Sequence, residues 1–364
     1  MNILHLTPHL NAGGLTTYIY TLAKGSIQQG HKVYVITSGG DLEDLFKEAG
    51  IEVLRMNIRT KSILSPKIYW ALPRIRKFIA EHQIQILHAH TRVTQVMAHW
   101  IQKKMKVIFV STCHGYFRAH WARRVFPCWG DATIAISREV LKHLEDDFKL
   151  SGDRIALIES GVDLEQFPLI TEDLRKHKKK ELGLEQIFVV GTIARLSDVK
   201  GVDILLKAVP EMLKERKDFR MLIIGQGKQE AELKQIVADL KLEETVSFDP
   251  AVQQTAAYLP VFDVFVVPSR QEGLGLSALE AQASGLAVVA SKVGGLKTLI
   301  QDGQTGLLVS PEDPTALAKA ILSLLADPSL RESLGKAART QVETGFNSAI
   351  MVEKTLNLYA RLMV

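Results

Sequence analysis

The stretch that decides the fold of this chain is Pro268-Ser269-Arg270-Gln271-Glu272-Gly273-Leu274-Gly275. A four-residue apolar run precedes it at 264–267, and a short apolar run bounded by turn residues is typical of a buried strand. Residues 276–283 read as the following helix, which puts Glu272 at the carboxyl end of the strand and Glu280 about two turns into the helix. Ligands of open α/β sheets bind at that end of the strands, and carboxylates accept hydrogen bonds from hydroxyls. The two carboxylates therefore indicate a site for a sugar.

A cationic segment lies upstream of this stretch. Arg195 and Lys200 follow another apolar run, residues 187–193, and both side chains are phosphate-binding types. Cations at the start of a helix oppose its macrodipole, so we expect an anion beside them, although plain surface charges are the alternative. Together with the two carboxylates, this segment predicts that the ligand is a nucleotide-diphosphate sugar.

These motifs resemble the signature of the retaining glycosyltransferases of family 4, which are built from two Rossmann-like domains in the GT-B arrangement. The matching residues keep the family's order between residues 195 and 306: Arg195, Lys200, Gly201, Gly225, Gly227, Pro268, Ser269, Glu272, Gly273, Gly275, Glu280, Ala281, Gly285, Gly294, Gly295, Gly303 and Gly306. Two positions depart from the pattern. Thr298 stands where the family usually has a glutamate, and Pro250 removes an amide donor from the turn before the nucleoside pocket.

The resemblance assigns roles to particular residues. His114 follows a predicted strand at 107–111, and in the resembled enzymes a histidine at this position lies beside the anomeric carbon. Glu272 is expected to bind the hydroxyls of the donor sugar, and Glu280 those of the ribose. The implied catalytic residues are His114, Arg195, Lys200 and Glu272. The implied donor-binding residues are Gly13, Gly14, Gly225, Gly227, Gly273, Leu274, Gly275 and Glu280.

Glycines and histidines in the first half have bottom-up interpretations as well. Gly13 and Gly14 follow the first predicted strand and open the first helix, where backbone amides favour an anion; tight-turn glycines are the alternative. The complete dinucleotide fingerprint is absent, which argues against a hydride-transfer cofactor. His88 and His90 end a predicted strand and are expected on the acceptor side, with a polar core as the alternative. A metal at this pair lacks a nearby carboxylate or cysteine as third ligand.

The length and the pattern of the chain predict its domain organisation. A chain of 364 residues exceeds the about 250–300 at which single cores stop growing. Strands alternate with helices in both halves, which predicts an α/β fold of two doubly wound Rossmann-like domains facing a cleft. We expect an acceptor-binding domain at 1–167, a nucleotide-sugar domain at 168–345, and a helix at 346–364 that crosses back to the first domain. The sequence alone equally allows that helix to cap the second domain.

Charge and composition restrict the partners. Residues 1–130 hold 17 lysines and arginines against 6 acidic residues, whereas the whole chain has a net charge of +5. This basic region also contains all four tryptophans and is expected to meet an anionic membrane surface or lipid-linked acceptor; a solvated surface with buried tryptophans is the alternative, and no nucleic-acid motif is present. Its basic residues are Arg55, Arg59, Lys61, Lys67, Arg74, Arg76, Lys77, Lys103, Lys104, Lys106, Arg118, Arg123 and Arg124. Two cysteines, no signal peptide and no long apolar run predict a cytoplasmic protein, peripheral at the inner face of the cytoplasmic membrane.

The sequence thus predicts a metal-independent, retaining glycosyltransferase without a cofactor. The expected donor is a UDP-hexose or UDP-N-acetylhexosamine, and the expected acceptor is an anionic or lipid-linked cell-envelope glycan such as lipopolysaccharide core. Arg195 and Lys200 take the place of a cation, because no Asp-x-Asp pair is found. The alternatives are a GT-B nucleotide-sugar epimerase or phosphorylase, and a catalytically silent nucleotide-binding scaffold.

Overall fold

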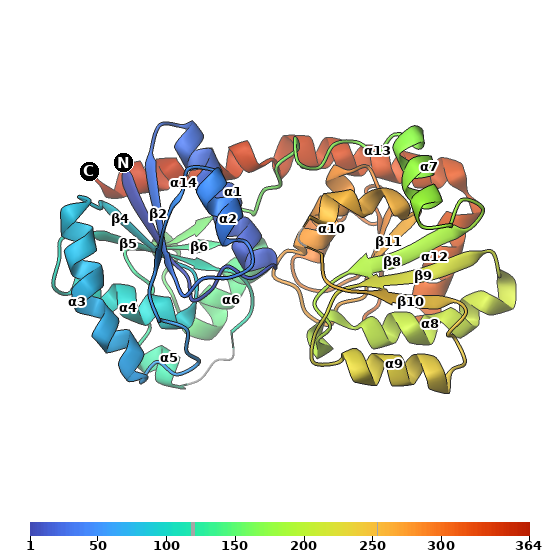
Figure 1. Ribbon diagram of the computed structural model, residues 1–364, viewed down its shortest axis with the longest axis horizontal. Helices are drawn as coiled ribbons and strands as arrows, with labels where there is room; N and C mark the ends of the chain where they lie inside the picture. The colour runs from blue at the N-terminus through green and yellow to red at the C-terminus, as the bar shows by residue number, and fades with distance from the viewer. Residues whose placement is uncertain (118–120, 253) are drawn as a thin grey trace. The chain divides into compact units, whose positions relative to one another are not determined.

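The computed structural model describes residues 1–117, 121–252 and 254–364, and these residues form two compact units. The first unit contains residues 1–161 together with 348–364, and the second contains residues 162–347. Each unit has one parallel sheet with helices on both of its faces (Figure 1). The predicted α/β fold with two Rossmann-like domains is therefore confirmed.

The first unit is built on a seven-stranded sheet in the order β3-β2-β1-β4-β5-β6-β7. Its strands are β1 (Asn2–Leu6), β2 (Lys32–Thr37), β3 (Glu52–Arg55), β4 (Ile86–Ala89), β5 (Ile108–Cys113), β6 (Ala132–Ala135) and β7 (Ile155–Leu157). Its helices are α1 (Gly14–Gln28), α2 (Glu43–Glu48), α3 (Pro66–Glu81), α4 (Arg92–Gln102), α5 (Trp121–Val125), α6 (Arg138–Phe148) and α14 (Ser348–Leu362). The strand order reverses between β1 and β4, and ligands of open α/β sheets typically bind outside the carboxyl ends of strands at such a reversal.

The second unit repeats this plan with six strands in the order β10-β9-β8-β11-β12-β13. Its strands are β8 (Phe188–Ile193), β9 (Phe219–Ile224), β10 (Val246–Asp249), β11 (Val264–Val267), β12 (Val288–Ser291) and β13 (Leu307–Val309). Its helices are α7 (Glu172–Glu181), α8 (Val202–Glu215), α9 (Glu230–Asp239), α10 (Leu276–Ala283), α11 (Leu296–Leu299), α12 (Pro314–Ala326) and α13 (Pro328–Gly345). Here the order reverses between β8 and β11, the strands that precede Arg195 and Glu272.

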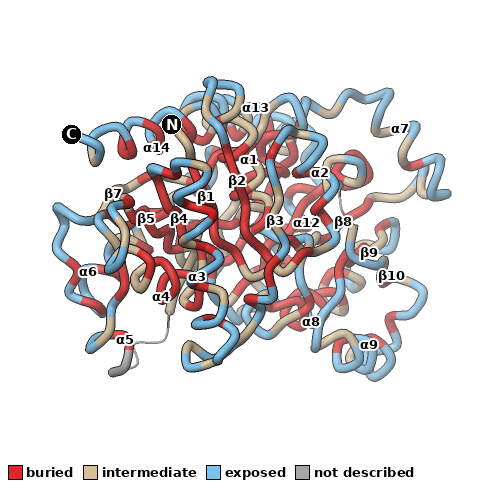
Figure 2. Tube along the Cα trace, turned by 60° about the vertical axis from the view of Figure 1, so that its left-hand side comes forward, coloured by how far each residue is buried: buried red, intermediate tan, exposed pale blue. Residues whose placement is uncertain are grey.

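The strands carry the hydrophobic cores. Figure 2 shows β1, β2, β4 and β5 as buried along most of their length, whereas the helices alternate between buried and exposed residues. A parallel sheet covered on both faces needs such continuous apolar strands. In the first unit one apolar core lies between the sheet and α3 and α4, and it includes Leu4, Leu87, Ile75 and Met97. The other face of this sheet carries polar side chains, among them His5 and His88.

The C-terminal helix α14 is grouped with the first unit. It packs against α1 so closely that a Cβ atom added to Gly25 would lie 2.5 Å from Val352 Cγ2. The division between the units falls at residue 161, not at the expected 167. The amide of Val162 donates to Phe346 O at 2.9 Å, and this contact keeps residues 162–167 with the second unit.

Several predicted elements need correction. Residues 255–257 form only a short 3-10 turn, Thr255–Ala257, and residue 253 lies outside the described residues. Glu280 is the fifth residue of α10, so it lies a little over one turn into the helix and not two. Helix α13 was missed. It begins with the same signal as α12, an aspartate cap followed by proline at the first position, because Asp327 accepts from Leu330 N at 3.0 Å.

Candidate donor and histidine sites

The second unit places its candidate donor site at the reversal between β8 and β11. Lys200 ends a 3-10 turn after β8, and its ammonium group forms an ion pair with Glu272 in the loop after β11. The hydroxyl of Ser269 donates to the same Glu272 oxygen, Oε1, at 3.0 Å. Glu272 is only 8% exposed, so its carboxylate is largely shielded from water. Lys200 and Ser269 both bind it there. The tertiary structure thus joins two of the four predicted catalytic residues.

Glycines in this region permit close backbone packing around Glu272. A Cβ atom at Gly201, which has φ +62°, would lie 2.1 Å from Pro268 O. A Cβ atom at Gly294, with φ +45°, would lie 1.9 Å from Glu272 O, and one at Gly295 would lie 2.2 Å from Gly273 O. Any side chain at these positions would displace the Glu272 loop. The Gly294-Gly295 pair therefore supports this loop by close backbone packing. This packing does not involve position 298, where Thr298 stands in place of the family's usual glutamate.

Arg195 differs from Lys200 in its environment. Its side chain is exposed, and it forms no ion pair within the described part of the chain. Gly225 and Gly227 pack against its loop, since added Cβ atoms would lie 1.9 Å from Ala194 O and 2.0 Å from Leu196 O. Both glycines therefore have a packing reason for their identity, besides the predicted approach to a nucleoside.

Arg270 is a residue to which the sequence analysis gave no role. Its guanidinium donates to both carboxylate oxygens of Asp203 at 2.8 and 2.9 Å and to the carbonyl of Asp198 at 2.8 Å. The hydrogen bonds that Arg270 donates to Asp203, and to a smaller extent those that it donates to Glu312, raise the pKa of Arg270 above its usual value. Because Asp198 begins the turn that ends at Lys200, Arg270 ties the Lys200 turn to the Glu272 loop. The signal was present in the sequence, since Arg270 lies two residues before Glu272.

Glu280 lies on α10 and is buried, with 8% of the residue exposed. Among the described residues, the carboxylate of Glu280 has one hydrogen-bond partner, Thr255, whose hydroxyl donates to Oε2 at 2.9 Å. Burial raises the pKa of Glu280 to about 7, and the hydrogen bond from Thr255 lowers it only in part. Near pH 7 the carboxyl group is therefore balanced between its neutral and charged forms.

This pKa predicts the pH dependence of donor binding. Below pH 7 Glu280 is protonated, and a protonated carboxyl has fewer acceptor sites for ribose hydroxyls. We expect the Kd for UDP-glucose to rise about tenfold between pH 8 and pH 6, because each pKa unit corresponds to a tenfold change in protonation. In Glu280→Gln the donor should bind more weakly, and its Kd should not change with pH. Isothermal titration calorimetry at both pH values measures this, and an unchanged slope in Glu280→Gln would assign the proton to another group.

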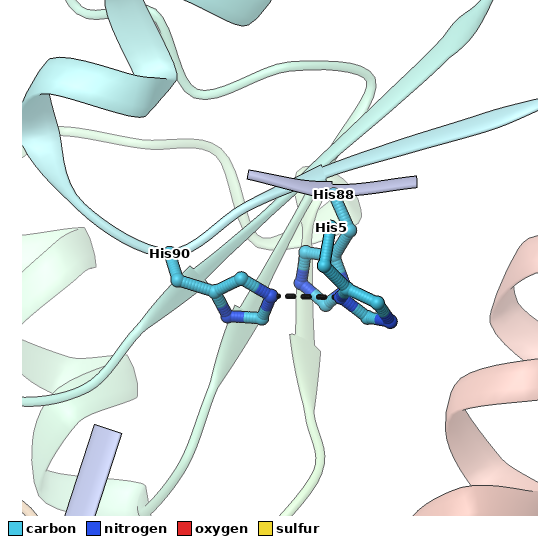
Figure 3. Close-up of side chains that lie close together, drawn as sticks. All are labelled: His5, His88 and His90. Atoms are coloured by element: carbon cyan, nitrogen blue, oxygen red, sulfur yellow. Dashed lines mark hydrogen bonds between the residues drawn. The ribbon is translucent and has the colours of Figure 1, made fainter. Parts of the chain in front are cut away.

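A histidine cluster lies toward the carboxyl ends of the central strands of the first sheet. His5 on β1 and His88 on β4 are direct partners in the parallel register, and His90 follows β4 on the same face. All three side chains are buried, and Figure 3 shows their rings gathered together. His114, directly after β5, is half-buried, and its ring meets Tyr18 edge-to-face at 4.7 Å. Three neighbouring strands therefore bring four imidazoles to one place.

Hydrogen bonds occupy most of the ring nitrogens in this cluster. His88 Nδ1 is bonded to Tyr359 Oη at 2.6 Å, and His88 Nε2 is bonded to Thr112 Oγ1 at 2.7 Å. His90 lies between His5 and His114, at 2.9 and 3.2 Å. The ring nitrogens of His88 and His90 are all hydrogen-bonded within the protein, as the polar-core alternative expects, and their contact with an acceptor substrate stays a prediction. Their β-strand register turns them into the core, where α1 and α14 cover them.

Burial also decides the charge of the cluster. Desolvation lowers the pKa of His5 and of His114 to about 3, and it lowers those of His88 and His90 well below their usual value. All four rings are therefore neutral at physiological pH. The sequence analysis missed His5, which adds a third imidazole beside His88 and His90, with candidate ligand atoms within 4.8 Å of one another. The alternating pattern of the first strand was the available signal.

Gly13 and Gly14 lie where they were predicted, at the start of α1 after β1. Gly13 has φ +146°, a conformation that favours glycine, and no atom lies within 4 Å of an added Cβ. Its identity thus follows from the backbone turn and not from crowding.

Two family models match the chain, one for each unit. The model for glycosyltransferase family 4 matches residues 12–166, and the model for glycosyl transferases group 1 matches residues 173–341. Two curated relatives are similar in sequence. D-inositol 3-phosphate glycosyltransferase of Streptomyces avermitilis is 33% identical over 246 residues, which cover 64% of this chain and 52% of that protein. A GDP-mannose-dependent monoacylated alpha-(1-6)-phosphatidylinositol monomannoside mannosyltransferase of Corynebacterium glutamicum is 31% identical over 236 residues, which cover 63% and 61%.

The chain spans about half the length of the D-inositol 3-phosphate glycosyltransferases of Streptomyces that it matches. Among solved structures, the HepE protein of Anabaena in complex with UDP-glucose matches with a TM-score of 0.88 at 20% identity, covering 99% of this chain and 100% of that one. At this identity the likeness shows the fold alone. The shared fold covers both units and the C-terminal helix α14.

Proposed function

Because the chain belongs to the glycosyltransferases of group 1 and family 4, we propose that it transfers a sugar from a nucleotide-diphosphate sugar to an anionic acceptor. The observation that carries this proposal is the Lys200–Glu272 pair at the reversal of the second sheet, with Arg195 exposed beside it. A diphosphate leaving group gains charge in the transition state, and fixed cations at that position stabilise it. Glu272 and Glu280 supply acceptors for sugar and ribose hydroxyls.

The anionic acceptor is supported by the names of the relatives and by the charge of the first unit. One relative is named for D-inositol 3-phosphate and the other for a phosphatidylinositol mannoside, both of which carry phosphate. Uridine and guanosine are the two candidate donor bases, since HepE was solved with UDP-glucose and the second relative is named for GDP-mannose. A thermal-shift screen of UDP-glucose, UDP-N-acetylglucosamine and GDP-mannose tests the proposal, because a bound donor stabilises the native state. No stabilisation by any nucleotide sugar, at concentrations up to the millimolar range, would contradict it.

We further propose that catalysis needs no divalent cation, because Arg195 and Lys200 supply the positive charge at the leaving group. Turnover of the preferred donor should be unchanged after incubation with excess EDTA and dialysis. Loss of activity that magnesium or manganese restores would mean that a metal ion, and not the two side chains, neutralises the diphosphate.

A surface patch on α3 and the loop before it supports docking to an anionic membrane. Its apolar members are Leu64 at 77% exposure and Trp70 at 79%, which are exceptional values for such large side chains. Exposed cations surround them at Arg59, Lys61, Lys67, Arg74 and Lys77. Lys67, Trp70, Arg74 and Lys77 share one outward stripe of the helix, since they are three or four residues apart. None of the described helices is long and apolar enough to cross a membrane.

Part of the predicted basic surface is not at the surface. Arg123 is only 7% exposed, and its guanidinium stacks over the ring of Phe117 at 3.8 Å. Desolvation lowers its pKa to about 10. Arg123 is therefore a core residue, and reversing its charge would destabilise the unit and not merely weaken docking. Arg118 lies outside the described residues.

Neutralising the patch should weaken membrane binding specifically. Each basic residue near an anionic surface contributes about 1 kcal/mol, so Lys67→Gln with Arg74→Gln should weaken binding to phosphatidylglycerol-containing vesicles about 30-fold. Co-sedimentation at low salt measures the partition, and the wild type should not sediment with phosphatidylcholine alone. Lys207→Gln with Lys214→Gln, on the exposed face of α8, is the matched control and should bind as the wild type does. Equal binding by both double variants would mean that the membrane docks on another part of the protein surface.

A further inference from the structure

Three imidazoles of this cluster form a hydrogen-bonded chain that ends at His114, one of the predicted catalytic residues. His5 Nδ1 is bonded to His90 Nε2 at 2.9 Å, which is the dashed line in Figure 3. His90 Nδ1 is bonded to His114 Nε2 at 3.2 Å. No described residue bonds to Nδ1 of His114, which is half-buried, so this nitrogen remains for a ligand. The chain thus runs from the core of the sheet to His114, whose remaining ring nitrogen is available to a ligand.

Counting protons leaves this chain with two arrangements. A neutral imidazole carries one N–H and one lone pair, and each bond between two rings uses one of each. If His5 donates from Nδ1, then His90 must donate from its own Nδ1, and His114 must also carry its proton on Nδ1. If the direction is reversed, all three rings carry their protons on Nε2. The two bonds therefore couple the tautomer of His114 to that of His5, which lies two residues away along the chain of bonds.

The far end of the chain decides between the two arrangements. His5 Nε2 is buried and has no hydrogen-bond partner among the residues that the structure describes. In the first arrangement this atom is a bare lone pair, and in the second it is an N–H without an acceptor. Among backbone groups, an orphaned buried N–H is rarer than an under-satisfied carbonyl, and the same ordering applied to the imidazole favours the bare lone pair.

We propose that His5 and His90 are positioning residues that hold His114 as the Nδ1–H tautomer, so that its available nitrogen donates a hydrogen bond. His114 then serves the transferred sugar or its leaving oxygen as a neutral donor and does not accept the acceptor's proton. The kinetic consequences rest on the proposed transferase function, whereas the tautomer itself does not. His88 takes no part in the chain, because both of its nitrogens bond to hydroxyl groups.

The tautomer is measured directly on the full chain. Long-range ¹⁵N–¹H spectra of protein with labelled histidine distinguish Nδ1–H from Nε2–H, and the signals that disappear in His114→Gln identify His114. We expect His114 of the wild type to carry its proton on Nδ1. A proton on Nε2 would overturn the proposal, and this readout needs neither a substrate nor a folded variant of His5. It therefore separates failure of the inference from failure of the proposed function.

Two substitutions at His5 test its positioning role. The amide nitrogen of asparagine is as many bonds from the backbone as Nδ1 of histidine, so His5→Asn keeps the donor to His90, whereas His5→Phe removes it. We expect His5→Phe to lower kcat about tenfold, the effect of one lost net hydrogen bond, with KM for the donor within about twofold. His5→Asn should restore most of kcat, and His177→Phe, at an exposed helical position, should have no effect. Equal kcat in His5→Phe and wild type would overturn the positioning role.

The same protein samples test the competing use of the cluster. Neutral imidazoles also bind transition metals, and His5, His88 and His90 offer three candidate ligands. Zn²⁺ alone should not bind with one-to-one stoichiometry in calorimetry. Stoichiometric binding that His5→Phe abolishes would overturn the proposal, because a metal would then hold the ring nitrogens that the chain needs.

Discussion

Lys200→Ala is expected to lower kcat about 100-fold, since removing one preorganised donor from a developing anion typically costs that much. Arg195→Ala should lower kcat at least about tenfold, because its exposed guanidinium is less firmly placed than the Lys200 ammonium. Initial rates with saturating donor measure both effects. Lys214→Ala, an exposed lysine of α8 that pairs with Glu211, is the matched control and should keep a rate near that of the wild type.

Loss of Lys200 also leaves Glu272 buried without its counter-ion, and this effect has to be separated from catalysis. Breaking a buried ion pair by removing one partner costs about 3–5 kcal/mol of stability at the upper end, and less here because 24% of the Lys200 side chain is exposed. We therefore include the double variant Lys200→Ala with Glu272→Gln, which removes the uncompensated charge. The double variant should recover thermal stability but not turnover. Recovery of both would mean that Lys200 acts only by supporting the fold.

The second large effect concerns Glu272 and the stereochemistry of the product. The resemblance implies that Glu272 positions the donor sugar and is not a covalent nucleophile. Glu272→Gln keeps a hydrogen-bond acceptor and should retain about a tenth of the activity, whereas Glu272→Ala should lose about 100-fold or more. Mass spectrometry of the wild type during turnover should detect no glycosyl-enzyme. A trapped adduct at Glu272, together with an inactive Glu272→Gln, would establish nucleophilic catalysis instead.

The configuration of the product tests the retaining assignment independently. With an α-linked donor such as UDP-glucose, NMR of the product should show an α-glycoside. A β-glycoside would remove the retaining assignment and with it the roles carried over to Glu272 and His114. Glu343→Gln, at an exposed position on α13, is a suitable control for the effect of replacing a carboxylate by an amide.

The fold and much of the donor site follow from local sequence patterns. The apolar runs of β8 and β11 are short, are bounded by turn residues and are continuous, and only a strand buried on both faces needs such a run. Because both strands are parallel, the residues that follow them must meet at one edge of the sheet. Arg195, Lys200 and Glu272 could therefore be placed after these strands from the sequence, and so could the fold class. The sequence left two positions open for the last helix, and the structure groups it with the first unit.

The histidine cluster shows what local patterns leave undecided. His5, His88 and His114 are separated by 83 and 26 positions in the chain, and only the strand order β1-β4-β5 makes them neighbours. The sequence alone did not say which face of β4 is covered by α1 and α14, so His88 and His90 were assigned to the acceptor side. The register of β1 and β4 turns them inward, where Tyr359 of the last helix bonds to His88.

Burial of single charges is the other property that only the tertiary structure decided. Arg123 and Arg124 are adjacent and look alike in sequence, yet Arg123 packs among aromatic rings and Arg124 is exposed. Arg270 was passed over, although its bonds to Asp203 and Asp198 fix the turn that presents Lys200. The chemical type of a residue and the strand or helix in which it lies follow from the sequence around it, because backbone preference and periodicity are local properties. Its partners, its desolvation and hence its pKa depend on elements distant in sequence, and these are set when the sheet assembles.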